Sequence, residues 1–224
     1  MKEYILIKPE AKKSDAISQS TDKTDLSPEM SIENLEEYAQ KFVNYDKIPI
    51  PKGVTAFLKV PHVRNGFDNS CSECSAEVIM RYWKIKNWNQ FRMHREGYLT
   101  FEGKIAEGDR GLAKLFQAGH FENLDGKALR FTVKDIKLKD FSALATWIDR
   151  KVPIIVRIFT NKARGDQHTQ VLVGYSKDAV FLNDNDVFSW KVMGGPHWIE
   201  TRMDEFLDGW AGKCLIIYPK TYKW

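Results

Sequence analysis

Two apolar segments late in the chain, residues 167–175 and 179–183, constrain the fold more than any other feature. Both contain Val, Leu and aromatic residues, and only Ser176, Lys177 and Asp178 separate them. A polar connection this short can join antiparallel strands, whereas parallel strands need a crossover of about a dozen residues or more. The sequence therefore predicts a β-hairpin, and with it an antiparallel sheet.

Other helix and strand patterns follow a definite order along the chain. Apolar residues at helical spacing predict helices over 76–83, 112–118 and 141–150. Strands are expected over 56–60, 129–133, 152–159 and 214–218, while residues 85–110 are aromatic and basic and give no clear assignment. Helices thus come mainly first and strands later, which favours an α+β fold over alternating βαβ units.

The first fifty residues differ in composition from the rest. Residues 9–28 are dominated by Lys, Ser, Asp and Thr, which is typical of a linker. Ser31 can cap a short amphipathic helix with an apolar stripe of Ile32, Leu35, Tyr38, Ala39, Phe42 and Val43. Prolines and a glycine over 46–53 then mark a boundary. We expect a flexible linker plus this helix over residues 1–50, and one domain over residues 51–224.

A cysteine stands just before the helix expected over 76–83. The polar, turn-prone run from Phe67 to Ser70 ends at Cys71, and apolar residues at helical spacing follow, namely Val78, Ile79, Tyr82 and Trp83. At a helix N-terminus, unpaired N–H groups and the helix dipole favour a thiolate over a thiol. Cys71 is therefore a candidate nucleophile.

A histidine at the start of the predicted hairpin supplies a partner for the cysteine. If the strands pair directly across the three-residue turn, His168 lies opposite Asp186, and Asp184 is its diagonal neighbour on the same face. A shift of one loop residue would place Asn183 or Asn185 there instead. The pattern thus supplies a histidine and an orienting acid without fixing which aspartate it is.

A cysteine, a histidine and an acid together can carry out nucleophilic catalysis. The thiolate attacks a carbonyl carbon, and the imidazole holds the proton and returns it to the leaving group. The acid fixes the imidazole tautomer and stabilises the imidazolium. The N–H group of Cys71, at its helix start, can stabilise the oxyanion that forms.

These segments resemble the C39-like cysteine peptidases of the papain-like superfamily. The resemblance covers about residues 56–219 and rests on four matching segments, which are Cys71–Trp83, Val152–Val156, His168–Asp184 and Phe206–Ile217. It implies an α+β papain-like cysteine protease fold, with an N-terminal central helix packed on an antiparallel β-sheet. It also implies a thiol protease that needs no cofactor.

The resemblance implies roles for individual residues. Cys71 would be the nucleophile, His168 the general acid and base, and Asp184 the orienting acid in preference to Asp186. The family places an oxyanion-stabilising glutamine about six residues before the cysteine, and this sequence has Asn65 there, one methylene shorter.

A second departure from the family follows the cysteine. The family has Gly-Pro or Gly-Ala at this point, whereas this chain has Ser72 and Glu73. A carboxylate two residues from a thiolate raises the thiol pKa, unless it points away or caps the helix. Glu73 therefore bears directly on whether the site is active.

Three functions stay open from sequence. The first is a cysteine peptidase or amidase that cleaves a peptide or isopeptide bond in a protein, a peptide or a peptidoglycan stem peptide. The departures at Asn65 and Glu73 leave open a catalytically weak or inactive papain-like domain that serves as a binding module. Acyl transfer of the transglutaminase type would use the same three residues.

The spacing of Cys71 and Cys74 also matches a CxxC motif, which suits redox chemistry or half of a zinc site. Zinc needs two further ligands. The remaining candidates are scattered along the sequence and form no second motif of two closely spaced ligands, namely Cys214, His62, His94, His120 and His197. No thioredoxin-like βαβ pattern surrounds the pair. We therefore expect no metal, and we expect Cys74 to be a core residue.

Composition and the length of the apolar runs limit which kinds of partner this protein can bind. The formal net charge is +4 and 43% of the residues are hydrophobic, so a sizeable core is expected and nucleic-acid binding is not. The sequence has no apolar run long enough to span a bilayer and no secretory signal at its start. The expected location is the cytoplasm, with release by lysis if the protein derives from a phage.

Overall fold

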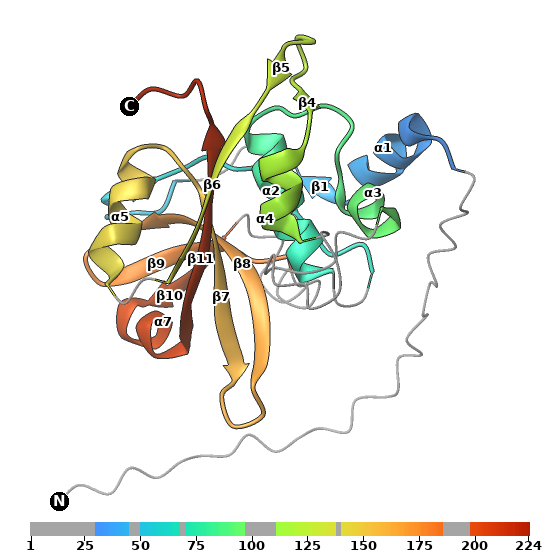
Figure 1. Ribbon diagram of the computed structural model, residues 1–224. Coiled ribbons are helices and arrows are strands. Elements are labelled where there is room, and N and C mark those ends of the chain that lie inside the picture. The colour runs from blue at the N-terminus through green and yellow to red at the C-terminus, as the bar shows by residue number, and fades with distance from the viewer. Residues whose placement is uncertain (1–29, 45–49, 68–69, 97–110, 138–139, 186–197) are drawn as a thin grey trace, which may run out of the picture.

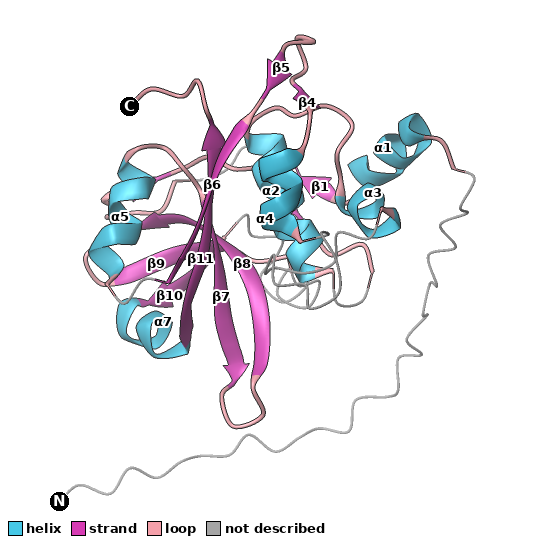
Figure 2. Cartoon of the chain, in the orientation of Figure 1, coloured by secondary structure: helices cyan, strands magenta, loops and turns pink. Residues whose placement is uncertain are grey.

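The computed structural model describes residues 30–44, 50–67, 70–96, 111–137, 140–185 and 198–224. Its helices are α1 (Ile32–Gln40), α2 (Cys71–Tyr82), α3 (Gln90–Arg95), α4 (Leu112–Ala118), α5 (Phe141–Asp149) and α7 (Met203–Gly209). Its strands are β1 (Val43–Asn44), β2 (Ala56–Phe57), β3 (His62–Val63), β4 (Phe121–Glu122), β5 (Ala128–Leu129), β6 (Phe131–Lys137), β7 (Ile154–Asn161), β8 (Asp166–Tyr175), β9 (Ala179–Asn183), β10 (Ile199–Arg202) and β11 (Trp210–Pro219). Figure 1 labels these elements along the chain, and Figure 2 colours them by type.

Most strands join one antiparallel sheet in the order β10-β9-β8-β7-β11-β6, and β2 also pairs with β8. Short turns connect β7 to β8 and β8 to β9, whereas β11 comes from the end of the chain and inserts between β7 and β6. Helices dominate the first part of the chain and the sheet forms mainly from the second part. The expected α+β class with an antiparallel sheet is confirmed.

The β8–β9 hairpin departs from the expected register at its turn and returns to it further along. The expected pairing of Tyr175 with Ala179 is wrong, because Tyr175 pairs with Val180. A register shift follows, and Leu172 then lies opposite Leu182, as direct pairing across the turn requires. The part of the hairpin that leads toward the candidate site therefore has the expected register.

Helices lie on both sides of this sheet (Figure 1). α2 packs over β8 and α4 over β6 on one side, and α5 and α7 lie on the other. α2 is buried nearly all round, as expected for a helix at the centre of a domain, and its fully buried apolar residues are Cys74, Ala76, Val78, Ile79 and Met80. The helix expected over 76–83 is found, but it begins earlier, at Cys71. Its first turns contain residues that are polar although they are buried, so the apolar pattern did not reveal them.

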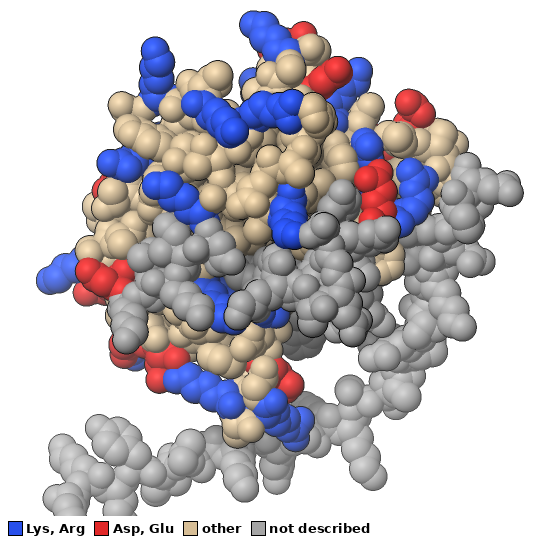
Figure 3. All heavy atoms as spheres, viewed as in Figure 1, with Lys and Arg blue, Asp and Glu red and all other residues tan. Residues whose placement is uncertain are grey.

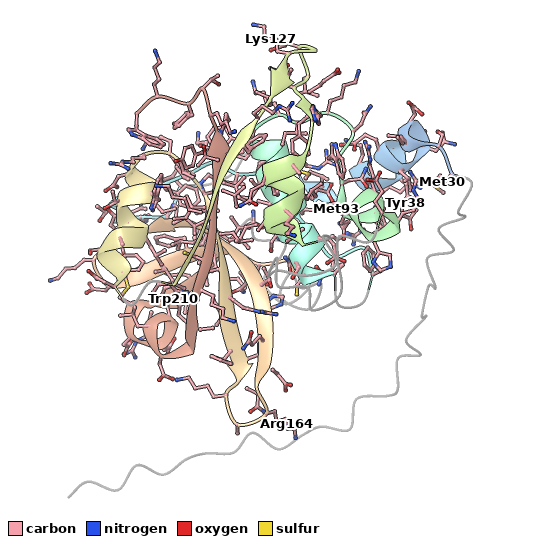
Figure 4. All side chains as sticks on the ribbon, in the orientation of Figure 1. Met30, Tyr38, Met93, Lys127, Arg164 and Trp210 are labelled. Carbon is pink, nitrogen blue, oxygen red and sulfur yellow. The ribbon has the colours of Figure 1, made fainter. Side chains whose placement is uncertain are left out.

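The helix expected after Ser31 is present as α1, and the Ser31 side chain caps it. Leu35 and Ala39 pack with Phe91 of α3 in a small cluster beside the main core. The side chain of Tyr38, a residue of α1, lies beside α3 (Figure 4), and its ring centroid is 4.9 Å from that of Phe91. The predicted amphipathic face therefore docks on α3.

An ion-pair network also ties α1 to the central helix. Arg81 of α2 lies 3.0 Å from Glu36 of α1 and 2.6 Å from Glu77 of its own helix.

The linker predicted over 9–28 lies outside the described residues. The division of the chain at residue 50 stays a prediction.

One predicted strand needs correction, and one segment left without an assignment contains a helix. The strand expected over 129–133 is broken, because β5 ends at Leu129 and β6 begins at Phe131. The segment without an assignment contains α3, a helix of less than two turns capped by Asn89, whose side chain accepts the Arg92 N–H at 3.0 Å. A helix this short shows too few apolar repeats for its period to be recognised.

The surface agrees with the mild net charge. Lys and Arg side chains are spread over the face seen in Figure 3, with acidic groups among them. None of the helices within the described ranges is long and apolar enough to cross a membrane.

Candidate active site

Cys71 is the first residue of α2. Ser70 precedes it as the N-cap, but its hydroxyl donates to the Phe67 carbonyl at 2.8 Å and lies 3.3 Å from Gln90 Oε1, so it does not cap the helix. The first N–H groups of a helix have no partner within the helix. Cys71 is partly exposed, whereas the other two cysteines are buried. The partly exposed cysteine therefore lies at the positive end of the central helix.

β8 supplies the histidine, and the residue directly after β9 supplies an acid. His168 Nε2 lies 2.8 Å from Asp184 Oδ1, and the side chains are 18% and 8% exposed. Because the carboxylate only accepts, Nε2 carries the proton in this bond, which leaves Nδ1 for the thiol. His168 also forms a hydrogen bond with the Cys71 thiol, so the predicted residues Cys71, His168 and Asp184 are brought together. Asp186 lies outside the described residues.

Cys71 and His168 shift each other's pKa. Burial acts to raise the pKa of the Cys71 thiol, but hydrogen bonds from His168 and from the main chain and hydroxyl of Thr169 outweigh it and lower the pKa to about 7. Burial acts to lower the pKa of His168, but hydrogen bonds to Asp184 and Cys71 raise it to about 10. Between these values the pair exists as thiolate and imidazolium, a form that can attack a carbonyl carbon.

Asn65 lies in the loop between β3 and α2. Its main-chain N–H donates to the Asn185 carbonyl at 2.8 Å, and the next N–H, of Gly66, donates to Gln90 Oε1 at 2.8 Å. Gln90 Nε2 also donates to the Arg64 carbonyl at 3.0 Å. The loop is therefore fixed on both sides of Asn65. The Asn65 Oδ1 atom is buried with no hydrogen-bond partner among the described residues.

Glu73, the residue that departs from the family pattern, is buried in the first turn of α2. One carboxyl oxygen lies 3.5 Å from His94 Nδ1. Burial raises the pKa of Glu73 to about 7, although its own main-chain N–H opposes this, and the charge of Cys71 raises it further. At neutral pH much of Glu73 is therefore protonated, which weakens its opposition to the thiolate.

Cys74 is the core residue that the sequence predicted. Its thiol donates to the Val63 carbonyl at 3.2 Å, the residue is fully buried, and burial raises its pKa well above the usual value. None of the three cysteines forms a disulfide. In the part of the chain that the structure describes, no group of three or more His, Cys, Asp or Glu side chains could hold a metal ion.

Sequence reasoning missed several polar residues that hold this site together. His62 Nε2 donates to the Asp184 carbonyl at 2.6 Å, Asn185 bonds to the carbonyl of Cys71 at 3.0 Å, and Thr169 bonds to the thiol. Each is a polar residue in or beside an apolar strand. That pattern signals a buried hydrogen-bonding role, because a buried polar group needs a partner.

Comparison with known proteins identifies the family. The family model described as Peptidase_C39 like family matches residues 57–211, more than half of the chain. Comparison with curated proteins gives no match.

Three solved structures illustrate the likeness. A putative C39-like peptidase from Bacillus anthracis is 14% identical with a TM-score of 0.48, over 80% of this chain and 100% of that chain. The peptidase domain of Streptococcus ComA, a bi-functional ABC transporter, is 16% identical with a TM-score of 0.47, over 73% and 96%. A double glycine motif protease from an AMS/PCAT transporter, solved with a leader peptide, is 17% identical with a TM-score of 0.45, over 74% and 96%. On the strength of the family match, this chain belongs to the Peptidase_C39 like family.

Proposed function

We propose that this protein hydrolyses a peptide or isopeptide bond with Cys71 as nucleophile, His168 as general acid and base, and Asp184 as the orienting acid. The observation that carries the proposal is the 2.8 Å bond between His168 and Asp184 beside a thiol at the start of α2. The proposed target is a peptide or isopeptide bond in a protein, a peptide or a peptidoglycan stem peptide.

In the first step the Cys71 thiolate attacks the carbonyl carbon and a tetrahedral oxyanion forms. The N–H of Cys71, at the helix start, and the side-chain amide of Asn65 are the proposed donors to that oxygen. Imidazolium Nδ1–H of His168 then donates its proton to the leaving amine, and the C–N bond breaks to give a thioester on Cys71.

In the second step neutral His168 accepts a proton from water, and the hydroxide attacks the thioester and breaks the C–S bond. The carboxylic acid leaves, and the Cys71 thiolate and the His168 imidazolium are restored. Asp184 keeps Nε2 protonated throughout, so that Nδ1 always faces the reacting atoms. Because Asp184 is 8% exposed, little solvent screens its charge, and it stabilises the imidazolium that is present at the start and formed again in the second step.

Selective alkylation tests the nucleophile. One thiol should react fast with iodoacetamide at about pH 6–7, and mass spectrometry should place the label on Cys71. Cys71→Ala should remove the fast phase and all cleavage of peptide and peptidoglycan substrates, whereas Cys214→Ala, a change far along the chain in β11, should keep both. If all three thiols react slowly, as ordinary thiols of pKa about 8.5 do, the peptidase proposal fails and a binding module is the better reading.

Acyl transfer of the transglutaminase type is the second candidate, because it would use the same three residues, Cys71, His168 and Asp184. The same thioester would pass its acyl group to an amine instead of water. Adding a primary amine such as glycine ethyl ester to the reaction separates the two functions. An amide product at the expense of the acid indicates transfer, and unchanged release of the acid indicates hydrolysis.

A further inference from the structure

A buried asparagine two residues after β9 bonds to both α2 and β8, the elements that carry the nucleophile and the histidine. Asn185 is 1% exposed, and its Nδ2 group donates to the Cys71 carbonyl at 3.0 Å, to Ser75 Oγ at 3.0 Å and to the Thr169 carbonyl at 3.3 Å. The first two acceptors belong to α2, and the third belongs to β8, directly after His168. A single amide group therefore bridges the helix of the nucleophile and the strand of the histidine.

The acceptors fix the orientation of this amide. Two of them are main-chain carbonyls, which only accept, so the NH2 group must face them. The Asn185 Oδ1 atom on the other side is buried and has no hydrogen-bond partner within the described ranges. A buried oxygen without a partner is unfavourable, so the donor group, and not the oxygen, explains an asparagine here.

The main chain of Asn185 extends the link to the remaining site residues. Its carbonyl accepts the Asn65 N–H at 2.8 Å. Its peptide neighbour is Asp184, whose own carbonyl accepts from His62 Nε2 at 2.6 Å. Asn185 is thus bonded to Cys71, to Thr169 beside His168, and to Asn65, and it directly follows Asp184 in the chain.

We infer that Asn185 is a positioning residue that sets the separation of the Cys71 thiol and the His168 imidazole. The inference rests on the proposed function, because that separation matters only for an active thiolate. Displacing such a pair by about 1 Å can lower a rate about a hundredfold. Asn185 acts through the main chain of Cys71 and Thr169 and contacts no reacting atom.

Asn183 provides a matched control. It is also 1% exposed, its Nδ2 group also donates to a main-chain carbonyl, that of Pro61 at 3.0 Å, and its Oδ1 atom likewise has no partner in the part of the chain described. Pro61 belongs to neither α2 nor β8. Asn183→Leu and Asn185→Leu therefore each remove one buried amide at similar volume, and only Asn185→Leu releases the two elements of the site.

The test is the pH profile of Cys71 alkylation in both variants, with urea unfolding as a measure of stability. Asn185→Leu should slow alkylation at about pH 6 by about tenfold or more and move the profile toward that of an ordinary thiol. Asn183→Leu should stay within about twofold of the wild type, with a comparable loss of stability. Equal rate changes in the two variants, or a wild-type profile for Asn185→Leu, would overturn the positioning role.

Asn185→Asp keeps the test decisive if the leucine variant does not fold. When protonated at low pH, the new carboxyl can still donate one hydrogen bond, but once ionised it faces three acceptors. Its alkylation rate relative to the wild type should therefore fall steadily as pH rises, and a ratio independent of pH would contradict the inference. A wild-type protein without a fast thiol would refute the proposed function itself, whereas fast alkylation in both wild type and Asn185→Leu would refute only the role of Asn185.

Discussion

His168 Nε2 and Asp184 Oδ1 lie 2.8 Å apart. The main chain of Asp184 is restrained as well, because its carbonyl accepts a hydrogen bond from His62 Nε2 at 2.6 Å. A carboxylate restrained at both its side chain and its main chain cannot follow the imidazole if the ring turns. The ring is therefore held with one nitrogen toward the acid and the other toward the thiol of Cys71.

Asp184→Asn should lower the rate of hydrolysis by about 10²- to 10⁴-fold while the fold is kept. The amide has no charge to stabilise the imidazolium, and its NH2 group can hold the ring in the wrong tautomer. The measurement is kcat/KM on the substrate found by the cleavage experiment. Asp149→Asn serves as control, since Asp149 is a carboxylate that accepts from the exposed Tyr175 hydroxyl at 3.0 Å on another part of the surface. Full activity in Asp184→Asn would remove the acid from the mechanism.

The pH dependence of hydrolysis should be bell-shaped. The thiolate forms as pH rises through about 7, the pKa of Cys71, and the imidazolium that protonates the leaving amine is lost as pH rises through about 10, the pKa of His168. Steady-state kcat/KM across this range checks both limbs, and alkylation of Cys71 should show the acidic limb only. An acidic limb near the ordinary thiol value would mean that the ion pair does not form.

How much of this site was predictable depended on the range of the interactions involved. The helix over 112–118 and the β8–β9 hairpin follow from local periodicity and turn chemistry, and both are present. The choice between Asp184 and Asp186 depended on strand register, which a shift near the turn altered and then restored. Local pattern could supply the acid and the histidine but not the distance between them.

Asn185 and Glu73 show what sequence patterns do not contain. The three acceptors of the Asn185 amide come from α2 and β8, which are far apart along the chain. Glu73 raised a question that sequence could not answer, because the effect of its charge depends on burial and on His94, which lies on a helix too short to be recognised. Both depend on tertiary packing.

Glu73→Gln should stabilise the protein in a pH-dependent way. Burial raises the pKa of Glu73 from 4.5 to about 7, so its contribution to stability is fully present below 4.5 and is lost as pH rises through 7. The neutral glutamine avoids this loss, and the gain in unfolding free energy should be on the order of 2 kcal/mol at pH 8 and close to zero at pH 4. Urea unfolding at both pH values measures it, with the exposed change Glu200→Gln as control. The same gain at both pH values would mean that ionisation of Glu73 is not its cause.

Gly66→Ala should destabilise the protein and impair the loop that carries Asn65. A methyl group at Gly66 would lie 2.6 Å from Cε1 of Phe91, a fully buried ring, and 3.2 Å from Oε1 of Gln90. Overpacking of this kind reduces unfolding free energy by about 1–3 kcal/mol. Because Asn65 is the proposed oxyanion donor, hydrolysis should fall more than alkylation, which forms no tetrahedral oxyanion.

The double variant Gly66→Ala with Phe91→Leu separates this contact from a general loss of packing. Phe91→Leu alone should also destabilise, because it opens space among Leu35, Ala39 and Gly66. In the double variant the smaller side chain makes room for the methyl group, so the loss of unfolding free energy should be less than the sum of the two single losses by about 1 kcal/mol. Strict additivity in urea unfolding would show that the Gly66 methyl group does not collide with Phe91, and the loop would then have to be fixed chiefly by the hydrogen bonds of Gln90.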